Sequence, residues 1–304
     1  MLAAIALSLA LTAPAIQLDV PLPGTKVTYA ERAGDPVRLS AYGLGTERAY
    51  LRARTGTAFS VRAGLSEVAL SPGGGTVAGV PAAYRSGYDS LLLTDRATGR
   101  TRRVPTVKKP LTASYASWSR DGARVALTVE RKVAGRWRAT GFTVVDVAAG
   151  TARTIRVAGL SGEAGFWWTP DGNLVARHGT GLRVHRATDG SVLRTFAGVG
   201  RPTGPEDAFS PSGRRMTLWC PPSFAERLCL ADTATGRITR RVAVRPEALF
   251  GWWDEEHVIA VLAHRRSYRL AVLDLDGKVT RVLAAIPAAT WTAELWLSFV
   301  RARR

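Results

Sequence analysis

The stretch GFWWTPDGNLVAR, residues 165–177, places Trp167 and Trp168 directly before a Thr-Pro-Asp-Gly turn. The same order of strand, turn and strand recurs in ALSPGGGTVAGV, SWSRDGARVALTV and AFSPSGRRMTLW, whose turns start at Ser71, Ser119 and Ser210. GWWDEEHVIAV, with Asp254 at the turn, is a degraded fifth copy. In the regular copies serine or threonine can hydrogen-bond the turn backbone and glycine accepts a positive φ. The stretch is therefore one member of a repeated unit.

A second repeat, offset from the first, consists of an apolar strand, a turn of small residues that ends in glycine, and a basic alternating strand. DRATGRTRRV, DVAAGTARTIRV and DTATGRITRRVAV show it most clearly. The turn glycines are Gly56, Gly99, Gly150, Gly190, Gly236 and Gly277. Their spacings of 43, 51, 40, 46 and 41 residues indicate one supersecondary unit per period.

Interleaving the two series gives four strands per unit, with alternating polar and apolar residues in the outer strands. Such units are typical of the blades of a β-propeller. The sequence therefore predicts an all-β fold, a six-bladed β-propeller of four-stranded antiparallel blades. The first unit lacks its first turn and the tail AELWLSFVRARR lacks a unit, so we expect N- and C-terminal strands to pair and close the ring. The predicted blades cover residues 25–63 with 291–304, 65–107, 113–158, 163–198, 204–245 and 247–286.

The motifs WTPDGNLVA, FSPSGRRMTLW, DRATG and DTATG resemble the WD40-like repeat in the C-terminal propeller of TolB and related cell-envelope proteins. The resemblance covers nearly all of the chain after about residue 25. It implies a fold but not an activity. TolB-like proteins also have a separate N-terminal α/β domain, for which this chain has too few residues before the first repeat, so a role of the Tol–Pal type does not follow.

The N-terminal run MLAAIALSLALTAPA is apolar, uncharged and ends in the small-x-small pattern Ala13-Pro14-Ala15. This is typical of a secretory signal peptide, residues 1–15, followed by a single propeller domain, residues 16–304. The usual preceding basic residues are absent, so a start further upstream or an ordinary N-terminal strand or helix stays open. In an exported protein Cys220 and Cys229, on either side of a Pro-Pro loop, are expected to form a disulfide. Two buried free thiols are the alternative.

The chain carries a formal net charge of +18, and only five of its 42 basic residues are lysines. A basic surface can bind nucleic acid, lipid head groups or anionic polymers of the cell envelope. The arginines are scattered along predicted strands, however, and the single asparagine of the chain indicates a coding bias toward arginine. We expect no specific nucleic-acid site and keep an anionic envelope polymer as an alternative partner.

The sequence contains no Gly-x-Ser-x-Gly motif and no hydrolase domain, which argues against a serine hydrolase gated by the propeller. Some six-bladed propellers instead hold a divalent cation in the central channel through oxygen ligands. Repeat geometry places several polar side chains at one end of this channel, namely Glu67, Tyr115, Glu206, Asp207 and Glu294. They are either a channel-mouth binding site or solvated residues at strand starts. Asn173 is not placed to supply an amide ligand, so we expect no metal and no cofactor.

Most other recurrent residues are assigned to structure. The aspartates before the hairpin glycines, such as Asp95 and Asp232, can accept hydrogen bonds from turn amides. The histidines lack the spacing of a zinc site; they are His178, His185, His257 and His264. The tryptophans are expected to fill the space between blades, with Trp118, Trp168 and Trp253 at one repeated position and Trp167 and Trp252 on the opposite sheet face.

The predicted loops between second and third strands carry aromatic residues that are candidates for partner contacts, namely Tyr84, Tyr88, Trp137 and Phe224. These features predict an exported, monomeric, non-enzymatic propeller, extracellular or in the cell envelope. It would bind a protein, peptide or glycan through its loop faces or channel mouth. A propeller enzyme with a divalent cation in its channel, similar to lactonases or lyases, is one alternative. A binder of anionic envelope polymers through arginine-rich surfaces is the other.

Overall fold

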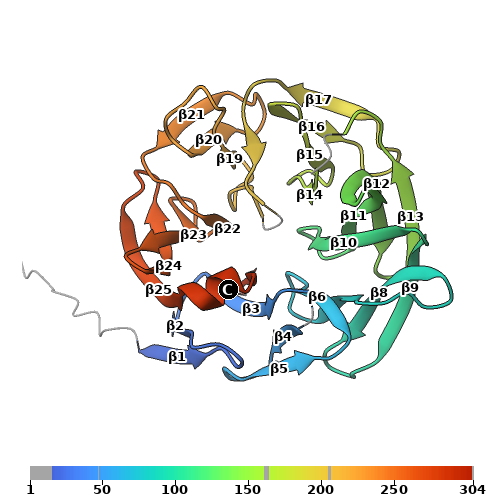
Figure 1. The fold of residues 1–304 in the computed structure, drawn as a ribbon, viewed down its shortest axis with the longest axis horizontal. Helices are drawn as coiled ribbons and strands as arrows, with labels where there is room; N and C mark the ends of the chain where they lie inside the picture. Colours follow the sequence, from blue (N-terminus) through green and yellow to red (C-terminus); the bar gives the residue numbers. More distant parts are fainter. Residues whose placement is uncertain (1–15, 47, 161–163, 205–206, 303–304) are drawn as a thin grey trace, which may run out of the picture.

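The computed structural model describes residues 16–46, 48–160, 164–204 and 207–302. Within these residues, six four-stranded antiparallel sheets stand as blades around a central axis (Figure 1). The predicted six-bladed propeller is therefore confirmed. The expected signal peptide, residues 1–15, lies outside the described residues.

Blades two to six each use four consecutive strands, ordered from the channel outward. The strands of blades two and three are β6 (Leu65–Leu70), β7 (Thr76–Pro81), β8 (Tyr88–Asp95), β9 (Thr101–Lys108), β10 (Leu111–Trp118), β11 (Arg124–Val133), β12 (Arg136–Asp146) and β13 (Thr151–Arg156). The strands of blades four to six are β14 (Phe166–Trp168), β15 (Leu174–His178), β16 (Gly181–His185), β17 (Val192–Phe196), β18 (Arg201–Pro202), β19 (Arg215–Trp219), β20 (Leu228–Asp232), β21 (Ile238–Val242), β22 (Ala248–Trp252), β23 (His257–His264), β24 (Ser267–Asp274) and β25 (Val279–Pro287).

Blade one is completed by the C-terminal strand. From the channel outward it consists of β26 (Leu295–Arg301), β3 (Val37–Leu44), β4 (Arg48–Arg52) and β5 (Phe59–Arg62). β26 pairs antiparallel with β3, from Leu295 opposite Leu44 to Arg301 opposite Val37. The expected closure by N- and C-terminal strands is confirmed, and it removes a sheet edge that would otherwise expose unpaired backbone groups.

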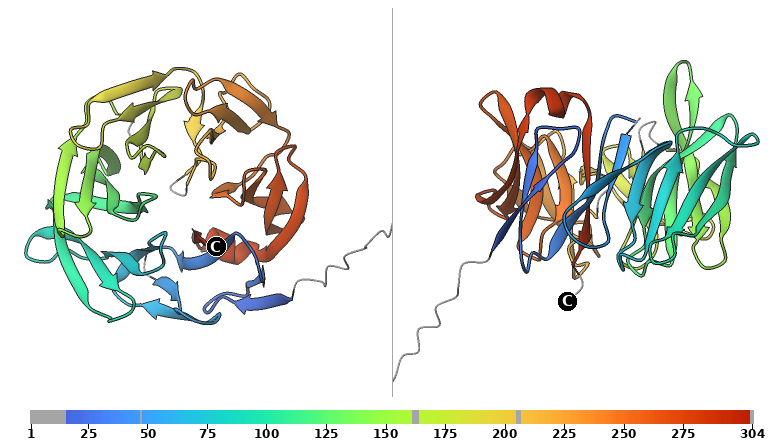
Figure 2. Two further views of the ribbon diagram at one scale, coloured as in Figure 1. Left: turned by 180° about the vertical axis from the view of Figure 1, so that it is seen from behind. Right: turned by 90° about the horizontal axis from the view of Figure 1, so that it is seen from below.

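The two ends of the ring differ in their connections. One end, here called the turn face, holds the turns after the first and third strands of each blade. There Gly122 N–H donates to Ser119 O at 2.9 Å, and Asp95 Oδ1 accepts the N–H groups of Ala97 and Thr98. The other end, the loop face, holds the loops after the second strands and the crossovers between blades, including α1 (Ala288–Thr292). Figure 2 shows α1 at one end of the ring, and β26 (Leu295–Arg301) runs from that end toward the other.

Indole hydrogen bonds connect neighbouring blades at one repeated position. Nε1 of Trp118 donates to Ala69 O at 3.0 Å, and Nε1 of Trp168 donates to Ser117 O at 3.0 Å. Trp252, not Trp253, is the equivalent residue in blade six, since its Nε1 donates to Ala208 O at 3.1 Å.

The assignment of Trp253 to this repeated position is therefore wrong. The degraded turn begins one residue earlier than its sequence indicates, because Trp253 N–H donates to His257 O as Thr169 N–H donates to Asn173 O in the regular copy. Trp253 is buried in the core cluster of blades six and one.

An N-terminal hairpin, which the sequence did not predict, packs beside the ring. It consists of β1 (Gln17–Pro21) and β2 (Thr28–Arg32), and its Val20 and Tyr29 are fully buried. Arg281 of β25 donates to Ala30 O at 2.7 Å and to Asp35 Oδ1 at 2.6 Å. The hairpin thereby extends the hydrophobic core shared by blades six and one.

Cys220 and Cys229 form the predicted disulfide. It connects the end of β19 with β20 and closes the intervening loop on the loop face. Cys229 is fully buried in the core of blade five, so one end of the loop is anchored. In the described part of the chain, no helix is both long and apolar enough to cross a bilayer.

Candidate functional site: the central cavity

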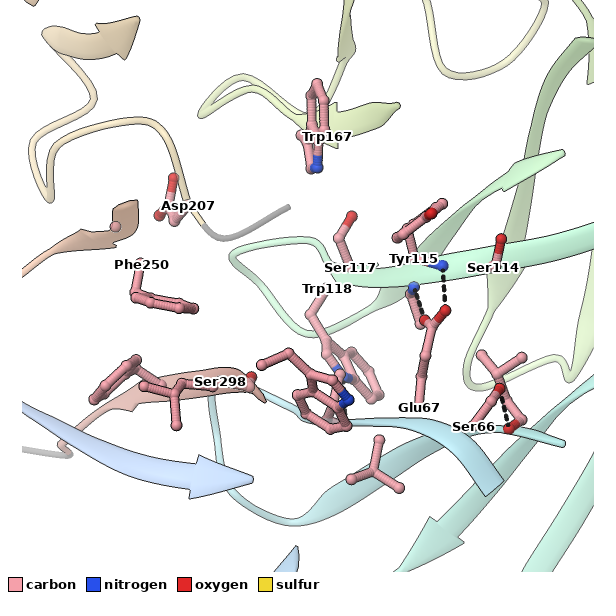
Figure 3. Close-up of a pocket in the computed structure, with 18 of the residues that line it drawn as sticks. Ser66, Glu67, Ser114, Tyr115, Ser117, Trp118, Trp167, Asp207, Phe250 and Ser298 are labelled. Carbon is pink, nitrogen blue, oxygen red and sulfur yellow. Dashed lines mark hydrogen bonds between the residues drawn. The ribbon is translucent and has the colours of Figure 1, made fainter. Parts of the chain in front are cut away.

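The first strands of the blades enclose a central cavity of about 1210 Å³ (Figure 3). All six blades contribute to its walls, with β6, β10, β22 and β26 supplying most of the lining. This volume exceeds the roughly 300–1,000 Å³ of a pocket for a small molecule. The cavity can therefore accommodate more than one small metabolite.

The charge of the cavity lining is opposite to that of the whole chain. Its carboxylates are those of Glu67, Asp89, Glu130, Asp207, Glu247 and Glu294. Against them stand the guanidinium groups of Arg120 and Arg301. Both are engaged, because Arg120 donates to Ser210 O at 2.7 Å and Arg301 donates to Trp252 O at 3.2 Å. A chain with a formal net charge of +18 thus encloses a predominantly acidic cavity.

Three of these carboxylates form an acidic wall between blades two and three, defined here as Glu67, Asp89 and Glu130. Glu67 accepts the N–H groups of Tyr115 and Ala116, each at 3.0 Å. Tyr115 has a left-handed backbone with φ 58°, a conformation in which successive N–H groups can face one anion.

The rest of the acidic wall is also held by hydrogen bonds. Glu130 accepts a hydrogen bond from Ser114 Oγ at 3.0 Å. Asp89 Oδ2 accepts Ala113 N–H at 2.9 Å. These bonds fix the carboxylates in position before any ligand binds.

Enclosure by the protein raises the pKa of each carboxyl group in the acidic wall. Desolvation is the main cause for Glu67, Asp89 and Glu130. The nearby charges of Glu130 and Asp89 raise the pKa of Glu67 further, and its two backbone hydrogen bonds only partly oppose this. A cation placed beside the wall would stabilise the ionised carboxylates.

The predicted channel-mouth residues do not share one end of the channel. Glu67, Tyr115, Asp207 and Glu294 all line the cavity, whereas Glu206 lies outside the described residues. Glu294 directly precedes β26 and so lies at the loop face, while Asp207 lies three residues before the turn at Ser210. The expected single acidic mouth is therefore spread along the channel, because the tail strand is offset from the other innermost strands.

Arg120 crosses from the blade-three turn to blade five at the turn face. Its Nη2 lies 2.9 Å from Asp207 Oδ2 and 3.0 Å from Phe209 O. Desolvation raises the pKa of Asp207, although Arg120 opposes this shift and 39% of the side chain is exposed. The channel walls remove much of the solvent around an otherwise accessible carboxylate. The sequence analysis did not identify Arg120. The feature that could have identified it is that Arg120 stands where the other three regular turns have a proline.

Aromatic rings form the rest of the cavity wall. Trp296 of β26 lies over Gly43 of β3, where an added Cβ would fall 2.3 Å from its Nε1. Trp167 covers Gly165 in the same way, at 2.5 Å from its ring. Each glycine leaves the space into which the indole packs, so a larger side chain at Gly43 or Gly165 would displace the tryptophan.

Two enclosed polar atoms of the lining have no hydrogen-bond partner among the described residues. They are Nε1 of Trp167 and Oγ of Ser117, and both side chains point into the cavity (Figure 3). The prediction that Trp167 belongs to the core is incomplete, because its ring packs on blade five but is only partly buried and also lines the cavity.

The predicted loop aromatics separate into different places. Tyr84 and Trp137 line the cavity, and Tyr84 Oη donates to Leu111 O at 2.9 Å. Phe224 lines a second cleft at the loop face. Tyr88 is exposed and lines neither space. Asp89 and Glu130 were missed by sequence reasoning, since they lie on strands with no motif around them.

Within the part of the chain that the structure describes, no group of three histidine, cysteine, aspartate or glutamate side chains is placed to hold a metal ion. His185 is buried in blade four, where its Nδ1 lies 3.0 Å from Gly190 O. Desolvation lowers the pKa of this histidine. Its burial and its contact with a backbone carbonyl indicate that His185 packs in the blade rather than binding a metal.

The comparisons with known proteins concern the fold. No protein-family model matches the sequence, and no curated protein matches it. Among solved structures, TolB from Acinetobacter baumannii aligns with a TM-score of 0.54 and 16% identity, over 88% of this chain and 66% of that chain. The fold is a TolB-like β-propeller. The resemblance of the sequence motifs to the TolB propeller is thereby confirmed.

Other solved propellers are equally similar. The β-propeller domain of the trilobed protease from Pyrococcus furiosus has a TM-score of 0.56 and 11% identity, over 90% of both chains. An oligogalacturonate lyase in complex with manganese has a TM-score of 0.56 and 12% identity, over 92% of this chain and 98% of that chain. These identities show the fold alone, and the chain spans less than two thirds of the TolB chain. Because the similar propellers include enzymes, the TolB-like fold does not determine a function.

Proposed function

We propose that this protein is an exported, non-enzymatic binding propeller whose central cavity takes a positively charged segment of a partner polypeptide. The acidic wall is the observation that supports this most directly. Glu67, Asp89 and Glu130 hold desolvated carboxyl groups with raised pKa values in one cavity. The disulfide supports export, because such bonds persist in oxidising compartments.

A cation fits this cavity for two physical reasons. Carboxylates in an enclosed site interact with a cation more strongly than they would in water. The aromatic lining adds ring faces that attract lysine and arginine side chains, as Trp167 and Trp296 are placed to do. Of the two arginines in the lining, Arg120 forms an ion pair with Asp207, which offsets its charge. Arg301 keeps its positive charge, but the six carboxylates of the lining outnumber the two guanidinium groups.

A peptide fits better than a metal ion or a single metabolite. Both oxygens of Glu67 already accept backbone N–H groups, which leaves this carboxylate poorly suited to ligate a metal. An extended peptide offers several ammonium and N–H groups, which can pair with carboxylates spread along the lining. The cavity volume of about 1210 Å³ accommodates several residues.

Binding of an amidated tetralysine peptide, measured by calorimetry, is the direct test. The intact protein is expected to bind the peptide despite its own positive charge. Glu130→Gln is expected to weaken binding by about tenfold or more, since a hydrogen bond to a charged group contributes about 1.5–3 kcal/mol. The matched control is Asp276→Asn, which removes the same charge from an exposed site on the turn face and should leave the affinity unchanged.

Three outcomes would contradict this proposal. The first is no binding of the peptide by the intact protein. The second is equal loss of affinity in Glu130→Gln and Asp276→Asn, which would indicate a diffuse effect of charge. The third is binding of calcium, magnesium, manganese or zinc that Glu130→Gln abolishes, which would favour the channel cation of a propeller enzyme instead.

Acidification is expected to weaken the binding of tetralysine. Desolvation raises the pKa values of Glu67, Asp89 and Glu130, so they take up protons at a pH above the ordinary carboxyl range near 4. The cation binds their ionised forms, so the affinity is full above the raised pKa values and falls as the pH drops through them. Calorimetry in buffers of different ionisation enthalpy should detect proton release on binding. An affinity that stays constant from about pH 7 to pH 4 would contradict this linkage.

A further inference from the structure

A second cleft, at the loop-face end of blade five, has a composition opposite to that of the cavity. It has a volume of about 800 Å³ and lies where blades four, five and six meet. Its charged lining residues are Arg177, Arg201, Arg227, Arg245, Glu226 and Glu247. Trp219 and Glu247 line both spaces, so the cleft lies next to the central cavity.

The pairing of strands explains why the arginines gather at this end. Arg201 on β18 is opposite Trp219 on β19. Just beyond the paired ends of β19 and β20, the carbonyl of Arg227 accepts Cys220 N–H at 2.8 Å. Arg245 follows β21 in the crossover to blade six. Arg201, Arg227 and Arg245 therefore all lie at the loop-face end of blade five.

Three of these guanidinium groups are available to a ligand. Arg201, Arg227 and Arg245 are exposed, and no side-chain hydrogen bond or ion pair of theirs occurs among the described residues. Of the two carboxylates in the lining, Glu226 lies 3.7 Å from Arg241, which is not itself a lining residue. Glu247 is exposed and offsets part of the positive charge of the cleft. The like charges repel one another, and a bound anion would relieve this repulsion.

We propose that this cleft binds an acidic polysaccharide through the carboxylates of its uronate residues. Arginine presents a planar fork of donors that matches a carboxylate in two parallel hydrogen bonds. The cleft is also lined by Trp219 and Phe224, with Arg241 over one face of the Phe224 ring. Such aromatic rings suit the apolar face of a sugar ring.

The disulfide favours a polysaccharide over a nucleic acid as the anion. Cys220 and Cys229 bridge the loop that carries Phe224 and Arg227, and disulfides persist mainly outside the reducing cytosol. The bridge also fixes the position of this loop before a ligand arrives, which reduces the entropic cost of binding. The cleft is separate from the acidic wall, so this site does not depend on tetralysine binding in the cavity.

Binding of alginate oligomers to the full chain tests this proposal. The cleft variant is the triple substitution Arg201→Gln, Arg227→Gln and Arg245→Gln. It is expected to weaken alginate binding by about tenfold, because three exposed ion pairs are removed. Binding to the intact protein should also weaken as salt is added, and the cleft variant should show a shallower salt dependence.

The matched control removes the same charge elsewhere on the loop face. The hairpin of β11 and β12 extends from the ring on the same side as α1 (Figure 2), and it carries Arg131, Arg136 and Arg138, all exposed. Substitution of these three by glutamine should leave alginate binding near that of the intact protein. Thermal unfolding of both triple variants checks that each is folded.

Each alternative outcome is decisive. An equal loss of affinity in the two triple variants would replace the cleft with a diffuse basic face. Equal binding of neutral dextran would show that carboxylates are not recognised. Tighter binding of polyphosphate or duplex DNA, lost in the cleft variant, would keep the anion site but overturn its assignment to uronates.

Discussion

Glu31→Ala is expected to lower the free energy of unfolding by about 3–5 kcal/mol. Glu31, on the N-terminal hairpin, accepts hydrogen bonds from both terminal nitrogens of Arg52 on β4, and Arg52 Nη2 lies 3.0 Å from Glu31 Oε1. The two side chains are only 3% and 10% exposed. Removal of the carboxylate would leave the Arg52 charge buried, and its other hydrogen-bond acceptors among the described residues are the neutral carbonyls of Gly56 and Leu39. Urea denaturation followed by tryptophan fluorescence measures the change.

The controls separate burial of the charge from loss of an ion pair. The exposed pair of Arg240 and Asp276 has side chains 47% and 80% exposed, and Asp276→Ala should cost less than about 0.5 kcal/mol. The double substitution Glu31→Met and Arg52→Met removes both charges and should recover much of the lost stability. If Glu31→Ala cost less than about 1 kcal/mol, the hairpin would not be docked on blade one as described.

The ring was predictable from the sequence because its determinants are local. A turn with glycine at a positive φ and a strand of alternating residues specifies a hairpin wherever it occurs, and the repeat then indicates the number of blades. The N-terminal hairpin was missed because it occurs once and has no repeat to identify it. The shift from Trp253 to Trp252 has a similar cause, since the turn at Asp254 lacks the glycine that marks the other turns.

The candidate site was predictable only where it follows the repeat. Glu67 and Tyr115 occupy corresponding places on innermost strands, and both line the cavity. The contact of Arg120 with Asp207 crosses from blade three to blade five, a distance around the ring that no sequence spacing encodes. The acidic wall likewise depends on Asp89 and Glu130, which come from later strands of two blades. Spatial convergence of residues from different blades follows from the closed ring rather than from a motif.

A chain that ends at Ala293 is expected not to fold cooperatively. This truncation removes β26, which pairs with β3 along its length and buries Leu295 and Leu297 at 5% and 3% exposure. Burial of each leucine contributes about 1.5–3 kcal/mol, and the loss of backbone pairing and of Phe299 packing adds to this. The total approaches the whole stability of a typical domain, about 5–15 kcal/mol. Circular dichroism during urea denaturation should show a broad, non-cooperative transition.

Two further chains make this test specific to ring closure. A chain that ends at Ala302 keeps β26 and its hydrogen bond from Ala302 N–H to Pro36 O, so it should unfold like the full chain. A synthetic peptide of residues 294–304, added to the chain that ends at Ala293, should restore a cooperative transition, because it supplies the missing innermost strand to the free edge of β3. If the truncated chain unfolds cooperatively without the peptide, blade one is stable with three strands and closure by β26 is not what holds the ring together.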